Sequence, residues 1–318
     1  MYKRIILFIA LLLVLLLGLE KLYDHFLLKN VDLKSSFVTS QPVNADVLFL
    51  GPCEPLWMMN PALFQKYAGL KGFNLSTVHA NFAENEGMLH LYLEHNKTPQ
   101  YLFLYVTTES VDGAFNVFNS YSFSQFVSDP FIKKMIEAQD PQYYRWVDWP
   151  FMKHAYYNSF ITFNMVQGIK HGLTGRMIPY YPDGYVPPHG ITWDMRYEHF
   201  VKEFPLGRHF EWNTSEVKAL QSLLDLAKAH GIKIVLYESP MLNEIKPFIL
   251  NRDEIKQKIA KFAMQNKVPY WVFDTMQISN TRSCFFSILN TNNKGSAIFN
   301  KTFADYFLRE VRRDSLLH

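Results

Sequence analysis

The fold is decided by one short apolar stretch, ADVLFLG at residues 45–51. An unbroken apolar run that ends at a glycine is typical of a strand buried on both faces, as in a parallel sheet. The sequence NPALF at residues 60–64 then favours the start of a helix, because Asn60 suits the capping position and Pro61 suits the first turn. The stretch therefore predicts a buried strand followed by a helix.

The same alternation of strand and helix patterns continues over most of the chain. Further buried strands are predicted at residues 72–75, 101–106, 232–237 and 270–273. Helices are predicted at residues 84–95, from 213 to about 230, at 252–266 and at 295–309. Strands that alternate with helices of about 10–15 residues predict an α/β fold, a three-layer α/β/α sandwich around a mostly parallel sheet.

The alternation is interrupted between about residues 110 and 212. This part holds two aromatic stretches, YYRWVDW at residues 143–149 and PYYPDGYVPP at residues 179–188. We interpret residues 110–212 as an insertion beside the strand ends. Its aromatic side chains either form the core of the insertion or stack on sugar rings, since aromatic faces bury C–H surfaces well.

The N-terminus carries the pattern of a membrane anchor. Two basic residues, Lys3 and Arg4, precede an apolar run over residues 5–19. No small-residue cleavage site follows, so we predict an uncleaved anchor at residues 1–22, a stalk at 23–44 and a folded domain at 45–318. The basic residues place the tail in the cytoplasm and the domain in the periplasm or outside the cell, on a single-pass protein of the inner (cytoplasmic) membrane. The run spans only about 22 Å, whereas the hydrocarbon core of a bilayer is ~30 Å thick.

Composition excludes several classes of protein. Of the 318 residues, 48% are hydrophobic and 19% charged, which excludes wholesale disorder. The net charge of +3 is too small to indicate nucleic-acid binding. Two cysteines, Cys53 and Cys284, are too few for a disulfide framework or a cysteine-based zinc site, and they form either one bridge or two thiols. No ligand spacing indicates a metal, and no cofactor is expected.

A series of short motifs resembles, in its order along the chain, the sequence blocks of membrane-anchored SGNH (GDSL-like) hydrolases. The motifs are GPCE at 51–54, NPALF at 60–64, FNL at 73–75, LYESP at 236–240, VFD at 272–274 and NTNNKG at 290–295. The first motif is most similar to that of D-alanyl-lipoteichoic-acid transfer proteins and other partners of membrane-bound O-acyltransferases. The resemblance implies a flavodoxin-like sheet, a site where the first and last motifs meet, and acyl-ester chemistry.

The resemblance assigns four positions to that site. Cys53 stands where the family has its serine nucleophile, and Asn74 takes the implied oxyanion-hole position. Ser287 and Asn290 stand at the positions of the family's acid and base. An asparagine accepts no proton at neutral pH, so the residues that Ser-His-Asp chemistry needs are not retained.

Cys53 needs less help than a serine, because a helix N-terminus lowers the pKa of a thiol. A thiolate at Cys53 would therefore still act as a nucleophile if a histidine from elsewhere in the chain served as its base. The candidate histidines are His79, His154, His171, His189, His199 and His209. Two alternatives for Cys53 are a buried packing residue and a disulfide to Cys284, which an oxidising compartment permits. Glu54 and Asn74 also have structural alternatives to a catalytic role. Glu54 suits a carboxylate at the start of a helix, and Asn74 suits a residue that anchors a loop by hydrogen bonds.

Three functions follow from these observations. The missing acid and base favour a catalytically degenerate protein, a pseudoenzyme that binds or assists in the O-acylation of cell-envelope glycan. The second is an active acyl esterase or O-acyltransferase with Cys53 as nucleophile, and the third is a structural subunit of an envelope complex. The expected partners are the membrane, a multi-pass O-acyltransferase and a glycan, without nucleic acid.

Overall fold

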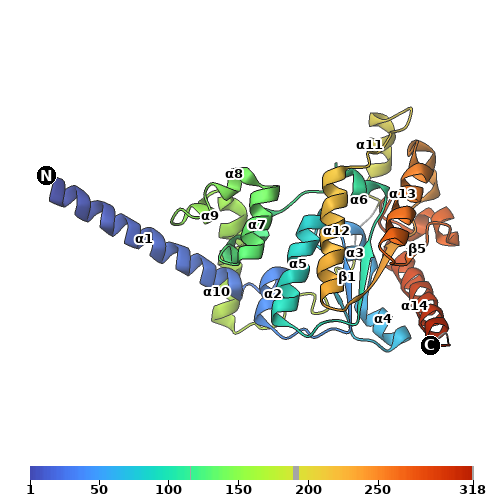
Figure 1. Cartoon of the computed structure of the whole chain (residues 1–318), viewed down its shortest axis with the longest axis horizontal. Helices are drawn as coiled ribbons and strands as arrows, with labels where there is room; N and C mark the ends of the chain where they lie inside the picture. The colour runs from blue at the N-terminus through green and yellow to red at the C-terminus, as the bar shows by residue number, and fades with distance from the viewer. Residues whose placement is uncertain (115, 189–192, 317–318) are drawn as a thin grey trace. The chain divides into compact units, whose positions relative to one another are not determined.

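The structure is a computed structural model that describes residues 1–114, 116–188 and 193–316. It is an α/β protein, in which a five-stranded parallel sheet lies amid many helices and a long apolar helix begins the chain (Figure 1). Contacts between residues divide the chain into two compact units. Unit 1 comprises Met1–Pro42, His90–Asn96 and Phe118–Pro182, and unit 2 comprises Val43–Leu89, Lys97–Val117 and the chain from Asp183 onward.

Unit 2 is built on the sheet, and each of its strands was predicted from the sequence. The strands are β1 (Val47–Leu50), β2 (Gly72–Asn74), β3 (Tyr101–Tyr105), β4 (Lys233–Glu238) and β5 (Tyr270–Val272). All neighbouring pairs are parallel, in the order β2-β1-β3-β4-β5. This is the strand order of flavodoxin-like open sheets, in which the order reverses between β1 and β3.

Two of the helices of unit 2 begin at the caps that the sequence predicted. The helices of this unit are α3 (Cys53–Met58), α4 (Pro61–Ala68), α5 (Phe82–His95, whose last turns belong to unit 1), α6 (Thr108–Asp112), α11 (Arg196–Glu203), α12 (Thr214–Ala229), α13 (Arg252–Gln265) and α14 (Asn293–Leu316), with short 3-10 turns at η2 (Asn243–Phe248), η3 (Gln277–Asn280) and η4 (Arg282–Cys284). The Asn60 side chain accepts a hydrogen bond from the Leu63 N–H at 3.1 Å, and Asn213 caps α12 in the same way. The predicted caps are therefore confirmed.

Phenylalanine rings fill the core beside the sheet. Phe49 on β1 and Phe103 on β3 stack with ring centroids 5.6 Å apart. Phe303 of α14 meets Phe103 edge-on at 4.8 Å, and it is fully buried together with Phe299 of the same helix. Burial of such a ring stabilises a fold by about 1.5–3 kcal/mol. These contacts hold the C-terminal helix against β1 and β3, whose carboxyl ends carry the candidate site.

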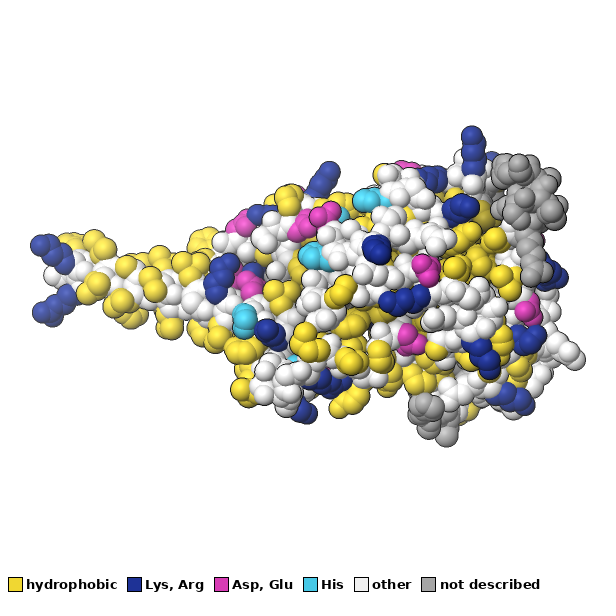
Figure 2. All heavy atoms as spheres, turned by 90° about the horizontal axis from the view of Figure 1, so that it is seen from below, with side chains coloured by type: hydrophobic (Ala, Val, Ile, Leu, Met, Phe, Trp, Pro, Cys, Tyr) yellow, Lys and Arg dark blue, Asp and Glu magenta, His cyan; other side chains and the backbone are white. Residues whose placement is uncertain are grey.

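Unit 1 consists of helices. They are α1 (Tyr2–Lys29), α2 (Lys34–Ser40), α7 (Pro130–Gln139), α8 (Pro141–Tyr144), α9 (Met152–Ala155) and α10 (Asn158–Thr174), with a 3-10 turn at η1 (Ser120–Phe126). Among the described residues, α1 is the one helix long and apolar enough to cross a membrane. Figure 2 shows hydrophobic side chains along α1 and basic side chains at its N-terminal tip. Residues 23–44, for which a stalk was expected, form the end of α1 and α2.

Candidate functional site

A sharp turn after β1 brings Cys53 and Glu54 to the carboxyl edge of the sheet. The turn passes through Gly51, where a Cβ atom would lie 2.7 Å from the Pro55 Cγ and 2.8 Å from the Tyr105 Cβ. Only glycine fits such a close approach without a shift of its neighbours. Gly51 therefore permits the tight turn that leads to Cys53 and Glu54.

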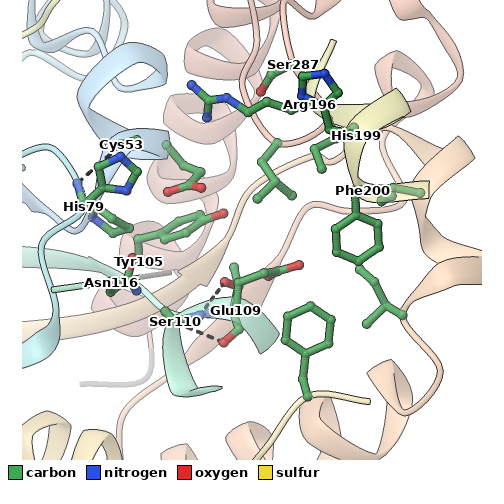
Figure 3. A pocket seen from close by; sticks show the side chains of 18 of the residues that line it. Cys53, His79, Tyr105, Glu109, Ser110, Asn116, Arg196, His199, Phe200 and Ser287 are labelled. Carbon is green, nitrogen blue, oxygen red and sulfur yellow. Dashed lines mark hydrogen bonds between the residues drawn. The ribbon is translucent and has the colours of Figure 1, made fainter. Parts of the chain in front are cut away.

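A cavity of about 430 Å³ opens at this edge, between the ends of β1 and β3 (Figure 3). Open α/β sheets bind ligands outside the carboxyl ends of their strands, at the point where the strand order reverses. The polar lining comes from the turn after β1, from the end of β3 with α6, from α11 and from the segment before α14. Its main members are Cys53, Glu54, Tyr105, Glu109, Arg196 and Ser287.

The thiol of Cys53 is buried, and its surroundings disfavour ionisation. The side chain is 4% exposed, and its sulfur accepts a hydrogen bond from the backbone N–H of His79 at 3.3 Å. Burial, followed by the neighbouring charge of Glu54, raises the pKa of Cys53 to about 12. The expected lowering of this pKa at the start of a helix is thus outweighed by desolvation.

Two carboxyl groups face the cavity with raised pKa values. Burial, together with the charge of Glu109, raises the pKa of Glu54 to about 7. Burial also raises the pKa of Glu109, with a further contribution from Glu238. Among the described residues, neither Glu54 nor Glu109 has a basic side chain within ion-pair distance, and the Oε2 atom of Glu109 is buried without a hydrogen-bond partner. The charge of Arg196 opposes the rise in the pKa of Glu54, but the ion pair of Arg196 is with Asp194 at 2.8 Å.

The opposite side of the cavity is apolar. It is lined by Phe200, Phe204, Phe210, Ile245, Ile249 and Ile288. Three of these, Phe210, Ile245 and Ile249, are at most 4% exposed and belong to one buried cluster. The cavity therefore offers carboxyl and hydroxyl groups on one side and a hydrocarbon wall on the other, a combination that suits an amphiphilic ligand.

The segment before α14 returns to the cavity, as the resemblance implied. Ser287 lines the cavity, and its hydroxyl accepts hydrogen bonds from the Asn290 side-chain amide at 2.9 Å and from the Asn290 backbone N–H at 3.2 Å. Asn290 is 1% exposed and supplies no base. Cys53 and Ser287 thus line one cavity, and Asn290 is hydrogen-bonded to Ser287.

Asn74 lies behind the turn that follows β1. Its amide group donates hydrogen bonds to the backbone oxygens of Pro55 at 2.7 Å and Met59 at 2.8 Å. An amide carries two hydrogens, and both are used here, so this side chain has none left to donate to an oxyanion. Asn74 ties down α3, which carries Cys53.

The two cysteines are separate thiols. Cys53 borders the cavity, whereas Cys284 is 2% exposed in the phenylalanine-rich core, and both are free. The disulfide alternative is therefore wrong for this structure. Of the candidate histidines, His79 and His199 border the cavity, and His154 and His171 belong to unit 1. His209 belongs to unit 2 but is not among the described residues that line the cavity. His189 lies outside the described residues.

Sequence reasoning missed Glu109 and Arg196. The signal for Glu109 was present, because the sequence TTES at residues 107–110 directly follows a buried strand and offers a helix cap. Thr107 and Ser110 form a capping box that starts α6. Glu109 lies within this first turn and lines the cavity. Arg196 belongs to the aromatic interruption, where no periodic pattern links a residue to the sheet.

No protein-family model and no curated protein matches this chain. The described residues also contain no group of three or more His, Cys, Asp or Glu side chains that is arranged to hold a metal. An inference about function therefore depends on the cavity and on the residues that line it.

Proposed function

We propose that this chain is a membrane-anchored, catalytically degenerate SGNH-like protein that binds an acylated glycan of the cell envelope. In this proposal the ligand occupies the cavity between β1 and β3, with its sugar hydroxyls toward the carboxyl groups and its acyl group toward the apolar wall. The strand order β2-β1-β3-β4-β5 supports a three-layer, flavodoxin-like sandwich of the SGNH type.

The observation that carries the proposal is the position of the cavity at the reversal of strand order. Glu54 favours a neutral, hydroxyl-bearing ligand, because a carboxyl group with a pKa of about 7 both donates and accepts hydrogen bonds near neutral pH, and Glu109 beside it has no ion-pair partner among the described residues. The apolar wall around Phe210 and Ile249 favours a ligand that also carries a hydrocarbon group.

Binding without turnover is favoured by the state of the nucleophile position. A thiol with a pKa of about 12 is almost entirely protonated at neutral pH, and only the thiolate attacks an ester. Asn290 supplies no general base at the family's histidine position. These two observations weigh against the alternative of an active acyl esterase or O-acyltransferase at Cys53.

The test uses the full chain in detergent and two probes, a partially O-acetylated cello-oligosaccharide and the same oligosaccharide after saponification. Calorimetry measures binding, and acetate release measures hydrolysis. We expect the acetylated probe to bind more tightly and to be recovered unchanged. Leu289 lines the cavity, so we expect a Leu289→Trp variant to occupy part of it and to lower the affinity at least tenfold, which corresponds to about 1.4 kcal/mol.

The matched control is Leu250→Trp, because Leu250 is 49% exposed and is not among the described lining residues. It leaves the affinity unchanged. Acetate release that disappears in a Cys53→Ala variant would overturn the proposal in favour of a Cys53 hydrolase. Binding of neither probe would overturn the proposed ligand class and favour a structural subunit.

A further inference from the structure

Unit 1 exposes two tryptophans on one short loop, which we call the tryptophan loop. It comprises residues 146–151, between α8 and α9, beside α1 (Figure 1). Trp149 is 62% exposed and Trp146 is 39% exposed. Tryptophan is seldom left in water to this extent, and a large apolar surface left open marks a site of interaction.

The tryptophan loop is fixed to α1 at a defined height. The backbone N–H of Phe151 donates a hydrogen bond to the Glu20 carboxylate at 2.8 Å. The Phe151 ring also meets the ring of Tyr23 edge-on, with centroids 5.0 Å apart. Phe151 has a φ of +67°, a conformation that costs a bulky residue free energy and that persists where surrounding contacts impose it.

Charged side chains reinforce the attachment directly beyond the loop. The ammonium group of Lys153 lies 3.2 Å from Glu20 and 3.0 Å from Asp24. The Nε2 atom of His154 lies 3.0 Å from the other oxygen of Asp24. Lys153 and His154 are both buried. The acidic side chains of α1 are therefore compensated at this level, which lowers the cost of bringing them close to a bilayer.

The height of Glu20 relative to a membrane follows from the length of the apolar run. Residues 5–19 span about 22 Å as a helix, whereas the hydrocarbon core is ~30 Å thick. A bilayer crossed by α1 must therefore reach at least to residue 19, and Glu20 lies at its boundary rather than out in water. The tryptophan loop, bonded to Glu20, lies at the same height.

We propose that the tryptophan loop is a second membrane contact, in which Trp146 and Trp149 insert into the lipid–water interface of the bilayer that α1 crosses. Tryptophans are enriched at this interface because the ring is apolar while its N–H remains near water. The contact adds interfacial anchoring to a helix whose apolar run is short. The proposal depends on α1 crossing the membrane and is independent of any ligand in the cavity of unit 2.

Leu173 provides a matched control in the same unit. It is 83% exposed, so it is at least as accessible as Trp149. Its neighbour His171 lies 3.4 Å from Asp32, which follows the end of α1. The helix rises about 14 Å between Glu20 and Lys29, at ~1.5 Å per residue. Leu173 is therefore expected to lie well away from the interface.

The experiment labels single cysteines with an environment-sensitive fluorophore in the full chain, in nanodiscs of phosphatidylcholine and phosphatidylglycerol. The variants are Trp149→Cys and Leu173→Cys, with Trp146→Cys as a second loop position. Cys53 and Cys284 are buried, and the unsubstituted chain, labelled in parallel, measures their background. The fluorophore is then quenched either by doxyl groups on lipid or by iodide in water.

We expect lipid-borne doxyl groups to quench the labels at positions 149 and 146 several-fold more strongly than the label at position 173. Iodide should show the reverse order. Labels at 149 and 146 that remain open to iodide would overturn the proposal. Shielding from iodide without quenching by lipid would also overturn it, in favour of a protein partner on the loop.

Discussion

Two pairs of acidic side chains lie at the same edge of the sheet, but only one pair has basic side chains as partners among the described residues. Glu54 and Glu109 follow β1 and β3, whereas Glu238 ends β4 and Asp274 follows β5. The second pair is neutralised from α13. The guanidinium of Arg252 lies 2.7 Å from Glu238 and also contacts Asp274, and the ammonium of Lys256 lies 2.7 Å from Asp274.

The pKa values follow this difference. Burial opposes ionisation of Asp274, but hydrogen bonds from Lys256 and Arg252 outweigh it, so the pKa of Asp274 is lowered. Glu54 has no such partner among the described residues, and its pKa rises to about 7. The presence of a neighbouring Lys or Arg side chain, rather than the position at the sheet edge, thus decides whether an acidic side chain forms a structural ion pair. The first pair keeps hydrogen-bonding capacity for a ligand.

The largest expected effect comes from breaking the neutralised pair. An Arg252→Met variant leaves Glu238 and Asp274 buried with fewer partners, and Arg252 is itself nearly buried. We expect the free energy of unfolding to fall by about 3–5 kcal/mol, the usual cost when one partner of a buried ion pair is removed. Denaturant unfolding of the full chain in detergent, followed by fluorescence, measures the change.

The matched control lies on the same helix. Lys258 forms an exposed ion pair with Glu254 at 2.7 Å, and a Lys258→Met variant should lose less than about 1 kcal/mol. Equal losses in the two variants would show that the cluster around Arg252 has no special part in stability. The contrast between the two acidic pairs would then lose its physical basis.

The next effect is a difference in how pH acts on the two pairs. The folded-state pKa of Glu54 is about 7, above its ordinary value of 4.5, so its contribution to stability is fully present below pH 4.5 and is lost as the pH rises through 7. A Glu54→Gln variant should lack much of this fall. The difference amounts to about 1–3 kcal/mol in the free energy of unfolding between pH 5 and pH 8.

The contribution of Asp274 to the free energy of unfolding changes with pH in the opposite direction. The pKa of Asp274 is lowered, so its contribution is present above its ordinary value of 3.8 and is lost as the pH falls. An Asp274→Asn variant should therefore keep the decline between pH 5 and pH 8. Unfolding of both variants is measured over this range, and parallel curves for wild type and Glu54→Gln would contradict the raised pKa of Glu54.

The sequence predicted the sheet well, because buried parallel strands are local and apolar. All five strands follow from apolar runs such as residues 45–51, and several flanking helices follow from caps such as Asn60, whereas the short helices α3 and α6 were not among the predicted elements. The resemblance, rather than any local pattern, implied that the segment around residue 290 returns to the turn at Cys53, and Ser287 does line the same cavity as Cys53. The strands, in contrast, needed only contacts that short patterns encode.

The rest of the site depends on distant partners. Whether Cys53 is ionised depends on how deeply it is buried and on the charge of Glu54, and a sequence does not give burial. Glu109 and Glu238 look alike as acids at strand ends, yet only Glu238 is paired with Arg252 of α13. The part from residue 110 to residue 212 lacks a regular pattern, so neither Arg196 nor the attachment of the tryptophan loop to Glu20 was predicted.

The smallest effect tests the electrostatics around Cys53 directly. The charge of Glu54 raises the pKa of this thiol, and the charge of Arg196 lowers it. We therefore expect Glu54→Gln to speed alkylation of Cys53 by N-ethylmaleimide at pH 8, and Arg196→Ala to slow it. Each rate should change about threefold if the pKa moves by about half a unit. Cys284, which is buried in the core, serves as the internal control, and its rate should stay constant. If both variants changed the rate of Cys53 in the same direction, access to the buried sulfur rather than charge would govern its reactivity, and the unpaired carboxyl group would not set the chemistry of the cavity.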